Sequence, residues 1–549
     1  MAGLALTLAM SLALIACAQA PAPATAPSKA ESPKSTSPSE QAKPAETKPA
    51  PAPAAKLATA AKPAATPQYG GILKILTAWP STPFGYPAEA GGGVGPIVFP
   101  SVDALVGMDN QGRATPKLAT AWEIGKDGKS ITFTLRKGVK FHDGTDFDAS
   151  AAKWNLDTVK KAGLDKTEAW TSIDAVDNNT VRINLSEYDN GILPMLSRTI
   201  GQMISPTAVE KNGKEWAHYN PVGTGPFKFV RFERDVVLRY DRFDGYWGPK
   251  PYVDGIEFRF VQDPMVQSAA FQAGEGHVIY RAPTTVAADL RTKGYEIIGT
   301  GGGALPASLD VLAPDTASPD SVFVDKRVRE AIEYAIDKRA IAKAVGLGFW
   351  EAANQVVPQG YTGYNAGLEG RSYNPAKARQ LLADAGYRDG FKTRIIAPTT
   401  AAKDMLVAIQ SNLKAVGVDV QLEAVPRARY NEYDTKGWNG GLIYVLMVLE
   451  PNVGNVLSRM MGSPVLRYVS LTRPTVWNDS LKGSRATADF ETYKSLTEKA
   501  VKFAYDDAMV VPLFESALPF VVGPTAHDTG FLTTGHQTHW TPEKAWLSK

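Results

Sequence analysis

The sequence predicts an α/β protein with mixed β-sheets flanked by helices. Two observations lead to this class. Segments that alternate apolar and polar residues are followed by segments with helical spacing, and residues 394–425 have the order strand, helix, strand that a βαβ unit requires. A chain of 549 residues is too long for one hydrophobic core, so we expect two or three domains.

The first half of the folded part contains two strands that alternate clearly. Residues 129–141 alternate in period two and end in a glycine turn, and the period then changes to that of a helix. This helix is expected to be capped by Asp146 or Asp148 and to end at Gly163. The next elements are a strand over 179–189 and a helix over 191–200.

The second half contains helices with complete start and stop signals. Residues 325–346 predict two helices, the second capped by Asp337 and ended by Gly346. Residues 374–387 begin with Asn and Pro and end with Gly, the residues preferred at N-cap, N1 and C′. Within the βαβ unit, the helix over 402–416 is expected to stop at Gly417.

Composition excludes some functions. Hydrophobic residues make up 44% of the chain and charged residues 21%, as in ordinary globular proteins. The 59 basic and 56 acidic residues give a net charge of +3, which provides no reason to expect a nucleic acid partner.

The N-terminus carries the single cysteine, Cys17, at the end of the apolar run LALTLAMSLALIAC. A short apolar run that ends in small residues is typical of a secretory signal, not of a transmembrane span. Residues 14–17, Leu-Ile-Ala-Cys, resemble a bacterial lipobox, in which the cysteine is lipidated. We therefore expect residues 1–17 to be a lipoprotein signal peptide; the alternative is an ordinary signal peptide that contains a cysteine.

Residues 18–67 consist mainly of Pro, Ala, Ser and Lys and contain no aromatic residue. Such a segment cannot bury enough apolar surface to fold, so we expect a disordered, semi-extended tether. At ~3 Å per residue in polyproline geometry, about fifty residues extend up to ~150 Å from a membrane. Together with lipid on Cys17, this predicts a protein anchored to the cell membrane, on the periplasmic side or at the cell surface.

No catalytic signature is present: the chain has no G-x-S-x-G, H-E-x-x-H, C-x-x-C or Walker A motif. The stretch GTGGGA (299–304) fits a dinucleotide fingerprint formally, but Pro306 argues against the helix that such a site needs, so we expect an interdomain turn. AGGGVG (90–95) is likewise expected to be a loop. We predict a protein that is not an enzyme and has no cofactor.

Histidines offer one weak metal candidate. His536 and His539, with His527 upstream, have a spacing that permits a small site. No carboxylate or thiol cluster accompanies them, so a solvated surface is the favoured interpretation and no metal is predicted.

Three segments together resemble the peptide/nickel-type solute-binding proteins of ABC importers (family 5). They are the stretch PKLATAW…FTLRKGVKFHDG within 114–157, the stretch NPVGTGPFKF…GYWGPKPYVDGI within 220–263, and residues 325–358 with the following YNPAKARQLLADAGY. The resemblance covers about residues 69–520. In the second segment we expect Gly223 and Gly225 to adopt positive φ and Pro226 to set a turn before a strand.

The resemblance implies a periplasmic-binding-protein-like clamp (type II) of two lobes with an extra inserted domain. The N-terminal lobe is expected to be discontinuous, and the lobes to be joined by strands near 305–312 and 508–515. The implied ranges are 68–100, 200–304 and 513–549 for the N-terminal lobe, 101–199 for the inserted domain, and 305–512 for the C-terminal lobe. The implied partners are a small-molecule ligand and the ABC permease and ATPase in the membrane, and a monomer is expected.

One stretch, GLIYVLMVLEPN (441–452), departs from the family pattern. Peptide-binding relatives usually have Gly-Trp-x-x-Asp-x-x-Asp-Pro here, and the first aspartate pairs with the ligand's ammonium group. In this chain Tyr444 takes the Trp position, Met447 replaces that aspartate, and Glu450 keeps the second acidic position. An unpaired buried ammonium costs several kcal/mol, so an apolar, aromatic or sugar-like solute is favoured over an ordinary peptide.

Ligand contacts are predicted for aromatic, glycine and polar residues of both lobes, although each also has the composition of a core residue. The predicted ligand-binding residues are Trp79, Gly93, Tyr444, Met447 and Glu450, with Trp350, Arg427 and Trp438 as further candidates. The alternatives are a di- or oligopeptide-binding protein, a surface lipoprotein that acts as a sensor without a permease, and a secreted hydrolase.

Overall fold

The structure is a computed structural model that describes residues 66–78, 83–90, 95–164, 167–299, 305–464, 467–532 and 540–549. The described residues belong to one unit, Ala65–Lys549. Several predictions fall on residues outside these ranges. They are the signal peptide with Cys17, nearly all of the tether, Trp79, Gly93, the glycine-rich stretches 91–94 and 300–304, and His536 and His539.

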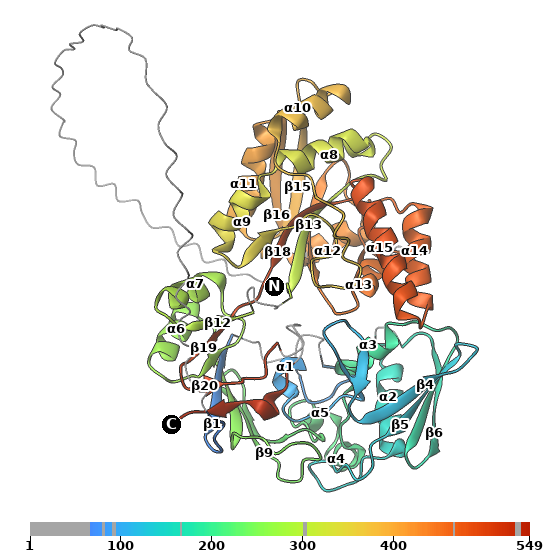
Figure 1. Cartoon of the computed structure of the whole chain (residues 1–549), viewed down its shortest axis with the longest axis vertical. Helices are drawn as coiled ribbons and strands as arrows, with labels where there is room; N and C mark the ends of the chain where they lie inside the picture. The colour runs from blue at the N-terminus through green and yellow to red at the C-terminus, as the bar shows by residue number, and fades with distance from the viewer. Residues whose placement is uncertain are drawn as a thin grey trace, which may run out of the picture. The chain divides into compact units, whose positions relative to one another are not determined.

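The C-terminal part of the chain is built on a six-stranded mixed sheet (Figure 1). Its order is β14 (Trp350–Ala352), β18 (Val511–Ser516), β13 (Ser308–Pro314), β17 (Leu442–Val448), β15 (Phe391–Pro398) and β16 (Val418–Val425). β15 and β16 are parallel and joined by a helix, as the predicted βαβ unit requires. The run 442–448 is therefore a core strand.

Helices cover both faces of this sheet (Figure 1). One face, with Leu312 and Tyr444, packs on α8 (Lys326–Ala335), α9 (Lys338–Gly346), α10 (Pro375–Asp384) and α11 (Lys403–Lys414). The other face, with Val311 and Met447, packs on α12 (Arg427–Lys436), α13 (Val453–Met461), α14 (Thr475–Ala486) and α15 (Phe490–Asp506). Because strand side chains alternate in direction, Tyr444 and Met447 belong to different cores.

A seven-stranded mixed sheet gathers strands from both ends of the described chain. Its order is β12 (Glu296–Ile298), β19 (Phe520–Val522), β11 (Val278–Ile279), β1 (Ile72–Thr77), β10 (Gly255–Phe260), β9 (Val237–Arg242) and β8 (Phe227–Glu233). β1 runs parallel to both of its neighbours, β10 and β11. α6 (Pro264–Gln272) and α7 (Thr284–Thr292) pack on one face of this sheet.

Between β1 and β8 the chain forms a separate four-stranded antiparallel sheet, which Figure 1 shows together with α2. Its order is β4 (Ala119–Ile124), β5 (Ser130–Leu135), β7 (Thr180–Leu185) and β6 (Trp170–Asp177), and α2 spans Ala149–Lys161. The short elements around it are α1 (Gly95–Val98), β2 (Val106–Met108), β3 (Ala114–Pro116), α3 (Ile192–Leu196), η1 (Thr199–Gly201), α4 (Pro206–Asn212) and α5 (Lys214–Ala217).

The remaining short elements lie near the C-terminus and before α8. They are β20 (Ala526–His527), β21 (Trp546–Leu547), η2 (Val322–Val324) and η3 (Pro542–Lys544).

The chain passes between the two large sheets twice, from β12 to β13 and from β18 to β19, and β13 and β18 pair with each other. These crossings lie close to the two joining strands expected from the resemblance. β18 stays paired in the six-stranded sheet as far as Ser516, so the predicted lobe boundary at 512 falls inside a strand. The boundaries themselves stay a prediction.

Local signals in the sequence match the observed helix ends. Asp148 is the N-cap of α2, since its side chain accepts from the amide of Ala151. Asp337 caps α9 in the same way. Asn374 caps α10, whose first residue is Pro375. These predictions are confirmed.

The expectation of positive φ at Gly223 and Gly225 is wrong: neither is among the positive-φ glycines. The reason for glycine is close packing. A Cβ at Gly223 would lie 2.1 Å from the carbonyl oxygen of Ser101, and one at Gly225 would lie 2.7 Å from the carbonyl carbon of Ser101. The GTGP motif is glycine-rich because two backbones touch there.

Candidate functional site

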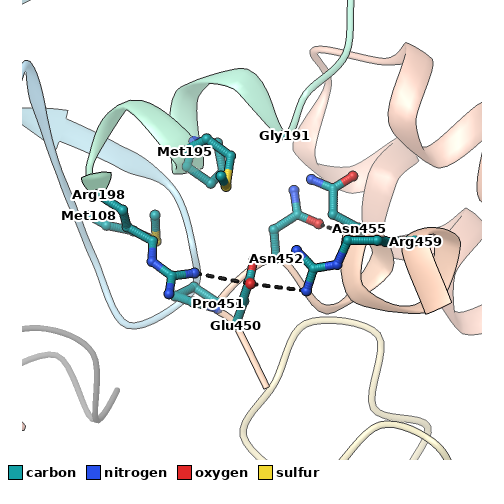
Figure 2. Close-up of a pocket in the computed structure, with 10 residues that line it drawn as sticks. Met108, Gly191, Met195, Arg198, Glu450, Pro451, Asn452, Asn455 and Arg459 are labelled. Atoms are coloured by element: carbon teal, nitrogen blue, oxygen red, sulfur yellow. Dashed lines mark hydrogen bonds and ion pairs between the residues drawn. The ribbon is translucent and has the colours of Figure 1, made fainter. Parts of the chain in front are cut away.

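A small cavity lies where the segment after the four-stranded sheet meets the segment after β17 (Figure 2). Its volume of about 10 Å³ is about what one water molecule needs. The lining residues are Met108, Gly191, Pro194, Met195, Arg198, Glu450, Pro451, Asn452, Asn455 and Arg459. Residues from distant parts of the sequence therefore meet here in close contact.

Local structure places Glu450 at this point. β17 ends at Val448, and Pro451 has no N–H to continue the ladder. Asn452 then caps α13, because its side-chain oxygen accepts from the amide of Asn455 at 3.2 Å. Glu450 thus occupies the short connection between a core strand and a capped helix, with its side chain toward α3.

Two arginines share the carboxylate of Glu450. Arg198 and Arg459 each place a guanidinium nitrogen 3.1 Å from the same oxygen, Oε1 (Figure 2). Burial by itself would raise the pKa of Glu450, but the two guanidiniums outweigh it and hold that pKa below its usual range. Arg198, Arg459 and Glu450 together carry two positive charges and one negative charge. The carboxylate of Glu450 therefore already has two ionic partners.

A second ionic contact lies beside the first. Nε and Nη2 of Arg485 donate to Oδ2 of Asp189 at 2.9 and 2.5 Å. Next to it, the side chain of Asn190 donates to the carbonyl of Ser484 and accepts from Nδ2 of Asn452 at 3.3 Å. A Cβ at Gly191 would lie 2.4 Å from Nδ2 of Asn455 and 2.9 Å from Oδ1 of Asp189, so a larger residue here would have to displace these side chains.

The end of β17 presents an open strand edge. β15 pairs with β17 only at Leu442 and Ile443, and the rest of β17 is paired on the β13 side alone among the described strands. Leu446 and Val448 on this stretch are 49% and 52% exposed. The hydroxyl of Tyr430 donates to the carbonyl of Tyr444 on this strand, and no described strand pairs with β17 beyond Ile443 on the β15 side. Exposed apolar side chains along such an edge are suited to an extended ligand that adds beside it.

Of the predicted ligand-binding residues that the structure describes, Glu450 alone lines the cavity. Trp438 is 1% exposed and donates to the carbonyl of Gly441, so it is a core residue. Trp350 is partly buried and stacks on Phe514 with ring centroids 5.6 Å apart. Arg427 is exposed at the start of α12, above the ring of Tyr430. Trp79 and Gly93 lie outside the described residues.

Tyr444 and Met447 lie on β17 but point to opposite faces. Tyr444 is 5% exposed and donates to Asp310 at 2.6 Å. Met447 has no exposed surface and packs in the core that α13 and α15 share. Ligand contact by either residue stays a prediction.

Arg198, Arg459, Asp189 and Arg485 were not predicted. Arg459 lies on the helix that follows the EPN sequence, a nearby signal that points to Glu450. Arg198 and Asp189 have no such signal, since they meet their partners only through tertiary contacts over more than 250 residues.

Metal binding and membrane spanning have no candidate in the part of the chain that the structure describes. That part contains no group of three His, Cys, Asp or Glu side chains placed to hold a metal ion. His527 is 3.1 Å from the hydroxyl of Ser548 and stacks on Trp546. Among the described helices, none is both long and apolar enough to cross a membrane.

Comparison with known families decides the identity of this architecture. The profile of the bacterial extracellular solute-binding proteins, family 5 (Middle), matches residues 113–446, more than half of the chain. The chain belongs to this family. The resemblance found in the sequence is thereby confirmed.

Individual relatives agree with the family assignment. The glutathione-binding protein GsiB of Salmonella paratyphi A is 34% identical over 347 residues, which cover 61% of this chain and 65% of the relative. The match thus spans just under two thirds of that protein's length.

Solved family 5 structures share the fold. NikA of Brucella suis, solved with Fe(III)-EDTA, is 25% identical with a TM-score of 0.77 and covers 86% of this chain and all of its own. The periplasmic binding protein DppA of Helicobacter pylori, solved with the peptide STSA, is 24% identical with a TM-score of 0.69, and the coverage is 88% and 99%. The predicted α/β periplasmic-binding-protein fold is confirmed.

Proposed function

We propose that this family 5 protein is the substrate-binding lipoprotein of an ABC-type importer, which captures a small organic solute between two lobes and delivers it to a membrane permease. The observation that carries the proposal is the open edge of β17, with its exposed Leu446 and Val448, beside the polar contacts of Glu450. Family membership supports the same role.

The proposed mechanism is binding without bond chemistry. The two crossings between the large sheets, β12 to β13 and β18 to β19, act as the hinge. A solute that contacts both sides favours the arrangement in which they approach, and the excluded water strengthens its polar contacts. The permease then recognises that arrangement.

Anchoring is proposed to use lipid on Cys17. The support is the lipobox-like sequence Leu14-Ile15-Ala16-Cys17 and the proline-rich stretch 18–67 that follows it. A mass increase on Cys17 that corresponds to a diacylglyceryl group, and loss of membrane association in Cys17→Ser, are the expected results. A cleaved, unmodified N-terminus would contradict this part of the proposal.

The proposed solute lacks a free ammonium group and is apolar, aromatic or sugar-like. Met447, at the position where the resemblance places an acidic residue in peptide-binding relatives, is uncharged and fully buried, and Glu450 already pairs with Arg198 and Arg459. Glu450 is the one carboxylate among the described residues that line the cavity, so an ammonium group there would find no uncommitted carboxylate. The exposed Leu446 and Val448 supply apolar contact instead.

Two alternatives remain. A peptide-like ligand is favoured by the identity of 34% to proteins named as glutathione-binding. A sensor lipoprotein without a permease would have the same fold, and a permease and ATPase pair encoded beside this protein's gene would argue against it.

The proposal is tested by mass spectrometry of small molecules retained through native purification, followed by thermal unfolding with a panel of glutathione, dialanine, phenylacetate and maltose. A ligand present in large excess over its dissociation constant raises the melting temperature. We expect phenylacetate or maltose, and not dialanine, to do so. A strong shift with dialanine alone would overturn the solute class, and no retained or stabilising solute would count against binding itself.

A matched pair of variants locates the site. Leu446→Ser alters the open edge of β17, and Val230→Ser alters an equally exposed apolar residue on β8, at 49% and 48% exposure. We expect only Leu446→Ser to weaken binding of the stabilising solute. Equal effects of the two variants would remove the open edge from the proposed site.

A further inference from the structure

Two ion pairs and an asparagine join residues 189–198 to the C-terminal part of the chain. The pairs are Arg198–Glu450 and Asp189–Arg485, and Asn190 lies between them with contacts to Asn452 and Ser484. We call these seven residues the clasp. They connect the region of the four-stranded sheet to the region of the six-stranded sheet.

Three of the four ionic groups of the clasp are largely shielded from water. Relative exposure of the side chain is 10% for Asp189, 16% for Glu450 and 18% for Arg198, while Arg485 is 31% exposed. Pairs buried to this degree are screened less by salt than pairs on an open surface. Separation of the two regions would return each of these side chains to water and remove its partner.

A hydrogen bond within its own segment orients the carboxylate of Asp189 toward Arg485. Its Oδ1 accepts from the amide of Gly191 at 2.8 Å, a bond within its own segment. Its Oδ2 accepts both donors of Arg485 from the other region. One carboxylate oxygen thus fixes the local turn and the other serves the contact across, an arrangement with little orientational freedom to lose.

Glycines permit the two regions to approach closely around the clasp. A Cβ at Gly112 would lie 2.8 Å from the carbonyl carbon of Pro451, and one at Gly191 would meet Asn455. Nearby, the hydroxyl of Thr362 donates to the carbonyl of Gln111 at 3.2 Å. Packing and polar contacts therefore coincide on one surface.

We propose that the clasp holds the region of residues 189–198 against the C-terminal part when no solute is bound, so that the ligand-free protein populates this arrangement and must break two ion pairs to admit a solute. Glu450 is then a positioning residue for closure, and its carboxylate does not contact the solute. The role given to the clasp in admitting a solute rests on the proposed solute-binding function. The test of the clasp itself uses the ligand-free protein and needs no solute.

The test measures the distance between the two regions in the ligand-free full-length chain. Spin labels are placed at Ala175→Cys on β6 and Lys494→Cys on α15, two exposed positions, in a Cys17→Ser background that removes the single native cysteine. Double electron–electron resonance then gives the population of the short distance.

Charge reversal tests the Asp189–Arg485 pair. We expect Asp189→Arg or Arg485→Asp alone to lower the short-distance population about threefold or more, as the loss of a partly buried ion pair predicts. The double variant, with the charges exchanged, restores most of that population. The charge-reversed pair in α12, Arg429→Glu with Glu432→Arg, is the matched control within one region and leaves the distribution unchanged.

Two outcomes would overturn the inference. If neither single reversal changes the distance distribution, the clasp does not control closure. If both singles open the protein and the double variant stays open, the residues act through folding and not through their mutual charge. Circular dichroism and thermal unfolding of each variant verify that the chain is folded.

Discussion

The hydroxyl of Tyr444 donates a 2.6 Å hydrogen bond to the carboxylate of Asp310, across the pairing of β17 with β13. Asp310 is 2% exposed and lies on one of the two strands that lead between the large sheets. Burial raises the pKa of Asp310 to about 7, and the bond from Tyr444 offsets only part of that rise. A carboxyl group that titrates near neutrality is therefore built into the proposed hinge.

This carboxyl group predicts a pH-dependent stability. An unfolded aspartate titrates near pH ~3.9, so the native state binds the extra proton between that pH and about 7. Stability contributed by this group therefore falls as pH rises through that window. We expect Asp310→Asn to gain stability relative to the parent protein between pH 5 and pH 8, by on the order of 2 kcal/mol, in urea unfolding.

Two controls accompany that measurement. Asp404→Asn changes an exposed carboxylate on α11 and should show no such pH trend. Glu515 on β18 also has its pKa raised to about 7, by burial and by Glu351, so Glu515→Gln separates the two contributions. A pH-independent effect of Asp310→Asn would mean that Asp310 is ionised throughout.

Glu450 predicts the opposite pH dependence. Its native pKa is lowered, so its contribution is present above the unfolded pKa and is lost as pH falls through the native value. We expect Glu450→Gln to lower the free energy of unfolding by about 1–3 kcal/mol at pH 7, because the half-buried Arg198 and the more exposed Arg459 both lose their partner, and by little in acid. Glu423→Gln, which removes the partly exposed partner of Arg394, should cost less than about 1 kcal/mol. If Glu450→Gln and Glu423→Gln lowered the free energy of unfolding equally at pH 7, Glu450 would contribute no more than an ordinary partly exposed ion pair.

Close backbone packing at Gly223 predicts that a side chain at this position lowers the free energy of unfolding. A side chain at Gly223 meets the carbonyl oxygen of Ser101, so Gly223→Ala is expected to cost about 3 kcal/mol in urea unfolding. Gly138 has φ +75° and no neighbour within 4 Å, so Gly138→Ala should cost about 1 kcal/mol from backbone strain alone. The reverse order of these two costs would show that backbone conformation, and not packing, requires Gly223.

Burial of Met447 predicts how substitutions there change the free energy of unfolding. The result bears on whether position 447 contacts the solute. Because Met447 is fully buried, Met447→Asp should place an unpaired carboxylate in the core and cost about 3–5 kcal/mol. Met447→Leu keeps the volume and should cost less than about 1.5 kcal/mol. A stable Met447→Asp protein that binds dialanine would show instead that position 447 reaches the solute.

The candidate site was only partly predictable from the sequence. Glu450 was predicted from the resemblance, because Glu450 followed by Pro451 keeps the second acidic position of the family pattern. Its partner Arg198 is separated from it by 252 positions (450 − 198), and no local pattern links the two. Trp350 and Trp438 show the converse: aromatic composition suggested a binding pocket, whereas tertiary packing buries Trp438 and stacks the partly buried Trp350 on Phe514.

The sequence by itself determined the helix caps, the strand of residues 442–448, the βαβ unit and the family, because each depends on the spacing of neighbouring residues. The tertiary structure alone decided which face of β17 Met447 occupies, why Gly223 is glycine, and where Asp189 finds Arg485. Those features depend on strand pairing and on contacts between distant segments. Local spacing determines which residues form an element, and only packing determines which elements meet.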